Sequence, residues 1–166
     1  MTYTPTYDNS IRVQKSLTLD VNGGTESDNL FALTGTVLIK RLWGVITEAT
    51  AGGDCDGVYF DVYSAGGSTV LTKNDGVLDS LGVGSIFFKE LVNTSTMSKI
   101  DNLSAPMFND SATADVPQFM ECIVGKDVGD LTYIRITHTS AGACDVDVTI
   151  FADYVPLSAG ASLVAV

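Results

Sequence analysis

Basic residues are scarce in this sequence. Only 9 of its 166 residues are Lys or Arg, against 20 Asp and Glu, and the formal net charge is −11. Proteins that bind nucleic acid directly need clusters of cations to contact phosphates, and here Lys40 and Arg41 form the one adjacent basic pair. The composition therefore argues against nucleic acid as a partner, and against an anionic membrane surface for the same reason.

Residues that commonly carry out catalysis are also few, because the chain has one histidine and three cysteines. A serine or cysteine triad would have to use His138. This residue lies on the apolar side of a strand predicted at 131–139, near a turn, where we expect a packed or edge histidine, and no nucleophile-elbow motif is present. The sequence predicts that the protein is not an enzyme.

Carboxylates offer the remaining route to hydrolysis, since glycosidases use a pair of them. Asp61, Asp145, Asp147 and Asp153 all fall on predicted strands. Aspartates that alternate along a strand are more typical of its solvated face. Trp43, the single tryptophan, lies in the most apolar part of the chain, where we expect it in the core rather than in a sugar-binding cleft.

The sequence shows no cofactor-binding motif. Its histidine and cysteines lack the spacing of a zinc site, and it has no glycine-rich phosphate-binding loop. Asp54 and Asp56, in a turn rich in Gly and Asp, are candidate calcium ligands because hard cations prefer oxygen donors. The motif is much shorter than an EF-hand loop, however, and we expect neither a metal nor a cofactor.

The three cysteines are Cys55, Cys122 and Cys144. Residues 1–10 do not resemble a signal peptide, so we expect synthesis in a cytoplasm and free thiols. An alternative stays open, because Ala-Gly-Gly-Asp-Cys-Asp and Ala-Gly-Ala-Cys-Asp each precede a predicted strand. If those strands pair, Cys55 and Cys144 would lie close together. No apolar run approaches the roughly 20 residues of a membrane-spanning helix.

Alternation of polar and apolar residues is the main structural signal. It predicts strands over 11–20, within 30–48, and over 58–63, 77–81, 86–92, 119–124, 131–139 and 145–154, separated by turns rich in Gly, Asn and Asp. A count of about eight or nine strands without a convincing helix indicates an all-β protein, an antiparallel β-sandwich with jelly-roll-like topology. We expect one domain over 11–156, with an extended N-terminal arm (1–10) and a C-terminal tail (157–166).

The block at residues 30–48 is apolar on both faces if it forms a regular strand. Simple alternation then places one set of side chains on one face (Val37, Ile39, Trp43 and Val45) and a second set on the other (Leu38, Leu42 and Ile46). A strand apolar on both faces is typically covered on both. We expect an adjoining subunit to cover the second face of this strand.

The stretch Asp-Asn-Leu-Phe-Ala-Leu-Thr-Gly-Thr-Val-Leu-Ile-Lys-Arg-Leu-Trp-Gly-Val-Ile-Thr, which begins at Asp28 and is followed by a Gly-rich turn and a short alternating strand, resembles small virion structural proteins of tailed bacteriophages. The opening Ile-Arg-Val-Gln-Lys-Ser-Leu-Thr-Leu-Asp-Val-Asn-Gly-Gly fits the same resemblance, which covers residues 1–65. It implies an all-β capsid- or tail-associated protein with no catalytic residues to transfer. The expected location is the virion, after synthesis in the host cytoplasm.

Two roles are compatible with that resemblance. The first is a capsid decoration (cement) protein that binds the major capsid protein or other virion proteins as a homo-oligomer, expected to be a trimer, and the second is a tail, fibre or head–tail component. One compact domain with an arm and no repeats favours decoration. The expected interface residues are Tyr3, Tyr7, Leu38, Leu42, Met107 and Phe108.

A carbohydrate- or ligand-binding β-sandwich is the alternative from a different class. It needs exposed aromatic side chains on one face. Tyr59 and Tyr63, with Asp61 between them, are the candidates.

Overall fold

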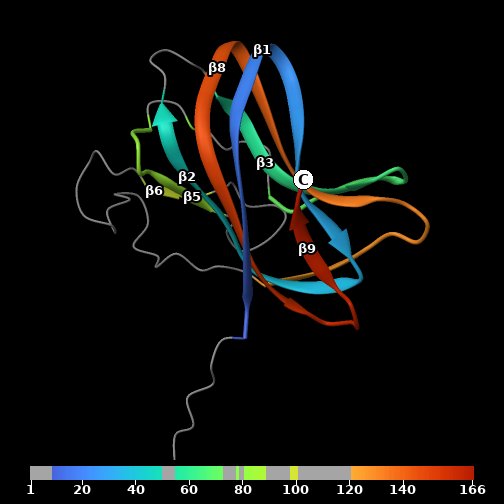
Figure 1. Cartoon of the computed structure of the whole chain (residues 1–166). Helices are drawn as coiled ribbons and strands as arrows, with labels where there is room; N and C mark the ends of the chain where they lie inside the picture. Colours follow the sequence, from blue (N-terminus) through green and yellow to red (C-terminus); the bar gives the residue numbers. More distant parts are fainter. Residues whose placement is uncertain (1–8, 50–54, 73–77, 79–80, 89–97, 101–120) are drawn as a thin grey trace, which may run out of the picture.

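The computed structural model describes residues 9–49, 55–72, 78, 81–88, 98–100 and 121–166 (Figure 1). These residues form strands and no helix, as the alternation predicts. The strands are β1 (Ile11–Thr34), β2 (Thr36–Ala49), β3 (Asp56–Ser64), β4 (Gly67–Val70), β5 (Ile86–Phe88), β6 (Ser98–Ile100), β7 (Cys122–Gly125), β8 (Thr132–Pro156) and β9 (Ser162–Ala165).

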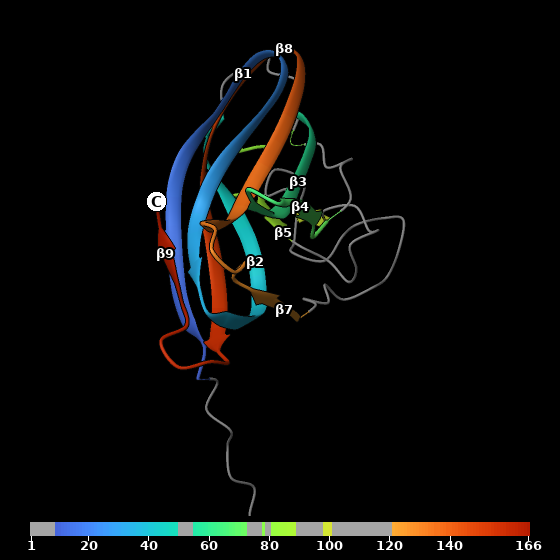
Figure 2. The ribbon, with the colours of Figure 1, turned by 90° about the vertical axis from the view of Figure 1, so that its right-hand side faces the viewer.

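The antiparallel pair of β1 and β8 determines the architecture. These strands are 24 and 25 residues long and pair along nearly their whole length, from Ile11 opposite Tyr154 to Leu33 opposite Thr132. Figure 2 shows both strands bending together through an arch. The register shifts between Asn22 and Gly24, and Gly24 has a φ of 114°, which L-residues with a Cβ rarely adopt. Each of the two long strands therefore has one half in the first layer and the other half in the second layer.

The other strands extend these two layers. In the first layer, β2 pairs with residues 146–156 of β8 and also with β5 and β7, while β6 pairs with β5. In the second layer, β3 pairs with residues 133–139 of β8 and with β4, while β9 pairs with the end of β1. All these pairs are antiparallel. Because they form two layers, the fold is sandwich-like. The predicted jelly-roll topology stays a prediction.

The core lies between the layers and contains apolar side chains from both. Phe60 of β3 and Phe87 of β5 are fully buried, and their rings stack with centroids 6.5 Å apart. Gly44 of β2 lies directly beside Phe87, where the ring occupies the space that a Cβ would need. Close packing of this kind leaves little tolerance for a change in side-chain volume.

A bulge in β2 changes which residues face the core. The register against β8 shifts between Ile39 and Arg41, so the alternation reverses there. Leu42 is 1% exposed and lies in the core, whereas Trp43 is half-buried on the outer face of the layer. The prediction of Leu42 as an interface residue and the prediction of Trp43 as a core residue are both wrong, because each assumed unbroken alternation.

The C-terminal segment is part of the sandwich. Residues 157–166, expected to follow the domain as a tail, include β9, which pairs with Phe31–Thr34 of β1. Ala161 and Leu163 are buried in the core, and the backbone N–H of Val166 donates to the carbonyl oxygen of Leu30 at 3.2 Å. The domain therefore extends almost to the last residue of the sequence.

Candidate functional site

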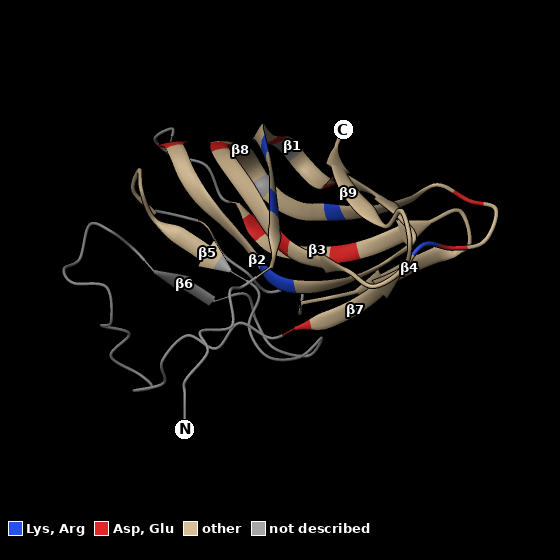
Figure 3. Cartoon of the chain, turned by 60° about the horizontal axis from the view of Figure 1, so that its bottom comes forward, with Lys and Arg blue, Asp and Glu red and all other residues tan. Residues whose placement is uncertain are grey.

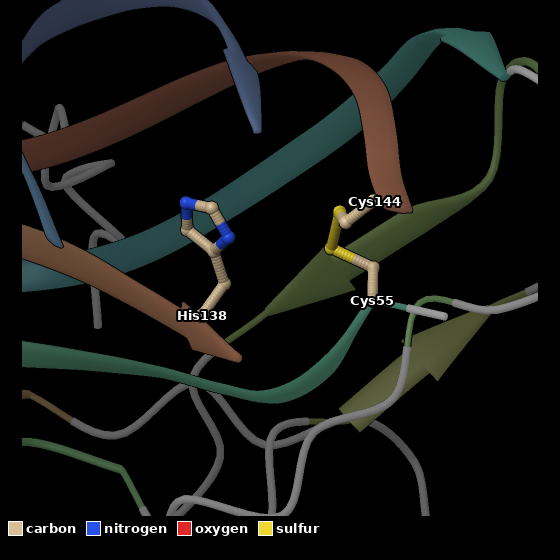
Figure 4. A group of neighbouring side chains, drawn as sticks. All are labelled: Cys55, His138 and Cys144. Carbon is tan, nitrogen blue, oxygen red and sulfur yellow. A yellow bond between two sulfur atoms is a disulfide. The ribbon is translucent and has the colours of Figure 1, made fainter. Parts of the chain in front are cut away.

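The arch of β8 brings three chemically reactive side chains together inside the protein. Cys55 lies just before β3, while His138 and Cys144 lie on either side of the arch in β8. Their ligand atoms all lie within 4.8 Å of one another, and all three residues are buried (Figure 4). We call Cys55, His138 and Cys144 the arch cluster.

Cys55 and Cys144 are joined by a disulfide bond. The free-thiol prediction is therefore wrong for these two residues, and the alternative that they lie close together is confirmed. The expected reason is not, because β3 pairs with residues 133–139 of β8 and not with the predicted strand at 145–154. The thiol of Cys122, on β7, is not part of this disulfide. The zinc-site spacing rules missed the arch cluster because they cover ligands near one another in sequence, whereas Cys55 and Cys144 are 89 residues apart.

His138 is fully buried, and its two ring nitrogens have different surroundings. Its Nε2 lies 3.3 Å from the carboxylate oxygen Oδ2 of Asp28 on β1. Its Nδ1 is buried without a hydrogen-bond partner. Figure 4 shows one ring nitrogen turned toward the two sulfur atoms, and this is Nδ1, since Nε2 is at the carboxylate. At 0% exposure, His138 is not placed to contact a substrate in solvent.

The predicted calcium ligands do not form a site in the part of the chain that the structure describes. Asp56 is half-buried at the start of β3 and belongs to no group of three or more potential metal ligands there. Asp54 lies outside the described residues.

A second group of side chains lies on the outer face of the first layer. Trp43 of β2 and Phe151 of β8 stack with ring centroids 4.2 Å apart and an interplanar angle of 16°. The guanidinium carbon of Arg12 lies 5.5 Å from the Trp43 ring centroid, within the range of a cation–π contact. Arg12 also donates two hydrogen bonds to Asp153, at 2.7 and 2.9 Å.

These residues continue into a larger surface. Arg41 lies 3.9 Å from the same Asp153 carboxylate, and Figure 3 shows acidic and basic positions close together on these strands. Beyond that charged row, Leu38 of β2 pairs with Val155 on one side and with the exposed Ile123 on the other. We call the eight residues Arg12, Leu38, Arg41, Trp43, Ile123, Phe151, Asp153 and Val155 the outer patch.

Of the six predicted interface residues, Leu38 alone lies on the outer patch. Tyr3, Tyr7, Met107 and Phe108 are outside the described residues, and Leu42 is in the core.

Three of the four aspartates considered for hydrolysis have polar partners, one on the second layer and two on the first. Asp61 is 1% exposed and accepts two hydrogen bonds from Arg135, at 3.1 and 2.6 Å, on the outer face of the second layer. Asp153 pairs with arginine on the first layer, and Asp147 accepts a hydrogen bond from Thr18 at 2.6 Å. Asp61 therefore lies on the other layer from Asp147 and Asp153.

The tyrosines considered for ligand binding flank the Asp61–Arg135 pair. The guanidinium carbon of Arg135 lies 4.0 Å from the Tyr63 ring centroid, so one face of that ring is covered. The hydrogen bonds to Asp61 raise the pKa of the Arg135 guanidinium above its ordinary value. The guanidinium of Arg135 therefore stays protonated throughout the physiological pH range.

Comparisons with known proteins give no relative. No family model, curated protein or solved structure matches the chain. Among the described residues there is no helix long and apolar enough to cross a membrane.

Proposed function

We propose that this chain is a non-enzymatic structural protein of a tailed-phage virion. Its role is that of a capsid decoration protein, which binds the assembled head as an oligomer, expected to be a trimer. The resemblance of residues 1–65 and the acidic, all-β character of the chain support this role. The outer patch is the observation that carries the proposal.

The outer patch has the composition of a protein–protein interface. The solvated face of an antiparallel sheet normally carries polar residues, yet here the half-buried Trp43, Phe151 and Leu38 lie in adjoining rows with the arginines. Aromatic residues and arginine are the types enriched at interfaces and at their energetic centres. Ile123, 68% exposed at the margin, enlarges the apolar area that a partner would cover.

The partner is expected to be the major capsid protein, another virion protein or a second copy of this chain. A stable contact needs roughly 1,000 Å² or more of buried surface. Because the net charge is −11, a partner surface that is neutral or basic would meet the least repulsion.

The test begins with the mass of the purified protein in solution, measured by light scattering on a sizing column. We expect three times 17.5 kDa. Purified virus particles from the source of the gene should then contain the chain in a copy number set by the symmetry of the shell. Particles without the chain would contradict the proposal, and a few copies confined to isolated tails would assign it to the tail instead.

A ligand-binding sandwich has less support from the described residues. The Tyr63 ring is in contact with Arg135 on one face, and Asp61 is already paired. Saturable binding of a glycan on an array, lost in Tyr59→Ala, would favour that function over the virion role.

A further inference from the structure

The arch cluster contains one more donor than a disulfide requires. The sulfur atoms of Cys55 and Cys144 and a ring nitrogen of His138 converge within 4.8 Å, from segments on both layers. Thiolate sulfur and imidazole nitrogen are the ligands that zinc prefers in proteins. The convergence of this particular set in one buried place is the starting observation.

The orphan nitrogen of His138 is the second observation. A buried polar atom without a partner costs about 1–3 kcal/mol, and nearly all such atoms in native proteins have one. Nδ1 of His138 has none and faces the sulfurs, while Nε2 is at the Asp28 carboxylate. Histidines that bind metals are typically oriented in this way, with one nitrogen on a carboxylate and the other on the metal.

We propose that Cys55, Cys144 and His138 Nδ1 bind one Zn²⁺ when the two cysteines are thiols, with Asp28 as the residue that positions the imidazole. Binding replaces the two S–H protons, which are released to solvent, and the fourth zinc position is left for water. The disulfide and the metal are alternative states, because each uses the same sulfur atoms.

The two states interconvert through a dithiol reductant. Two electrons and two protons from that reductant open the S–S bond to two thiols, and the reductant itself becomes a disulfide. A newly synthesised chain already has thiols, so zinc binding at that stage needs no reductant.

Distances and charge both favour zinc. Bonds of about 2.3 Å to sulfur and 2.0–2.1 Å to nitrogen place the donors of a tetrahedral site roughly 3.5–3.8 Å apart. Side chains already within 4.8 Å reach that spacing by small rotations once the S–S bond is open. Zn²⁺ neutralises two thiolates, whereas Cu⁺ would leave a net negative charge buried beside Asp28, which is costly.

The experiment uses the full-length Cys122→Ser protein, so that the arch cluster holds the only cysteines. The reduced protein is titrated anaerobically with Co²⁺ as an optical probe and then with Zn²⁺. We expect a thiolate-to-cobalt charge-transfer band and tetrahedral d–d bands that saturate at one equivalent and disappear on adding Zn²⁺. The same protein with its disulfide intact is the matched control and should give neither band.

Two variants separate this site from adventitious binding. His138→Ala should weaken Zn²⁺ binding at least about tenfold, and Asp28→Asn should weaken it by about 10–100-fold, the usual effect of losing such a partner. Asp127→Asn, in the loop before β8, should change nothing. Because Asp28 is one-third exposed, its variant is expected to fold even if His138→Ala does not.

Three results would overturn the proposal. These are no cobalt bands in the reduced protein, an affinity for Zn²⁺ unchanged in both the His138 and Asp28 variants, or cobalt bands of equal strength in the protein whose disulfide is intact. The proposal does not depend on the virion role, since it concerns the isolated chain.

Discussion

Cys55 and Cys144 are joined by a disulfide across 89 residues of sequence, with their Cα atoms 5.1 Å apart. Cys55 precedes β3 in the second layer, and Cys144 lies on β8 where that strand has passed into the first layer. The bond therefore connects the two layers beside the arch. Both residues are buried, which protects the bond from solvent.

Reduction of this disulfide should lower stability. A cross-link that closes a loop of this length contributes about 2–5 kcal/mol, largely by restricting the unfolded chain. We expect the free energy of unfolding in urea to fall by that amount when the Cys122→Ser protein is reduced in the absence of metal. The Cys55→Ala/Cys144→Ala variant should match the reduced protein.

A thiol count provides the control for that measurement. The unreduced chain in denaturant should react with one equivalent of a thiol reagent, through Cys122, and the reduced chain with three. Three reactive thiols before reduction would show that the bond is not formed in the purified protein.

The Asp61–Arg135 pair should be sensitive to the loss of one partner. The side chain of Asp61 is 1% exposed and that of Arg135 is 17% exposed. Asp61→Ala therefore leaves the Arg135 cation largely buried and without its partner carboxylate. We expect a loss of about 3–5 kcal/mol in the free energy of unfolding. The exposed Asp20→Asn, on β1, should stay within about 0.5 kcal/mol of the parent protein.

Removing both partners tests the reason for that loss. Asp61→Leu/Arg135→Met should cost less than the sum of the two single changes, because no buried charge is left unpaired. Strict additivity would mean that the two side chains do not interact in solution.

Gly44 and Gly125 provide a second matched comparison. A Cβ at Gly44 would overlap the ring of Phe87 and lie 2.7 Å from Cδ1 of Ile150. Overpacking of this kind costs about 1–3 kcal/mol, and Gly44→Ala should lower the thermal midpoint accordingly. Gly125→Ala meets its nearest atom, Thr36 Oγ1, at 3.7 Å and should be tolerated. Equal effects of the two changes would argue against the packing described around Phe87.

The outer patch makes the proposed assembly testable by mutation. Trp43→Ala removes the stack with Phe151, and Arg41→Glu reverses a charge beside it. We expect either change to shift the solution mass from oligomer toward monomer, while far-ultraviolet circular dichroism stays unchanged. Thr18→Ala, exposed on the same face of β1, is the control. An unaltered oligomer in both patch variants would mean that subunits associate elsewhere.

Much of the all-β character was predictable because alternation is a local property. The strands expected at 11–20 and 145–154 lie within β1 and β8, where apolar side chains such as Leu19 and Val148 face the core as predicted. The length of these strands was not predictable. Each passes through the arch as one continuous strand, so residues expected in separate strands belong to the same element.

The candidate site was predictable only in part. Two similar turns indicated that Cys55 and Cys144 would be near each other if their strands paired. The structure confirms the contact but not that pairing, because β3 pairs with residues 133–139 of β8 instead. No sequence signal placed His138 beside them, because the pairing of β1 with β8 and the arch together set its position. Asp28 likewise reaches the ring from a neighbouring strand 110 residues away.

The sequence by itself determined the fold class, the scarcity of catalytic side chains and the acidic charge, since these follow from composition and short-range periodicity. Only the tertiary structure decided which side of β2 faces the core, because the bulge after Ile39 reverses the facing of the side chains from Arg41 to Ile46. It also decided that Cys55, Cys144 and His138 meet, because a strand that arches between layers brings distant residues together in a way that no local pattern records.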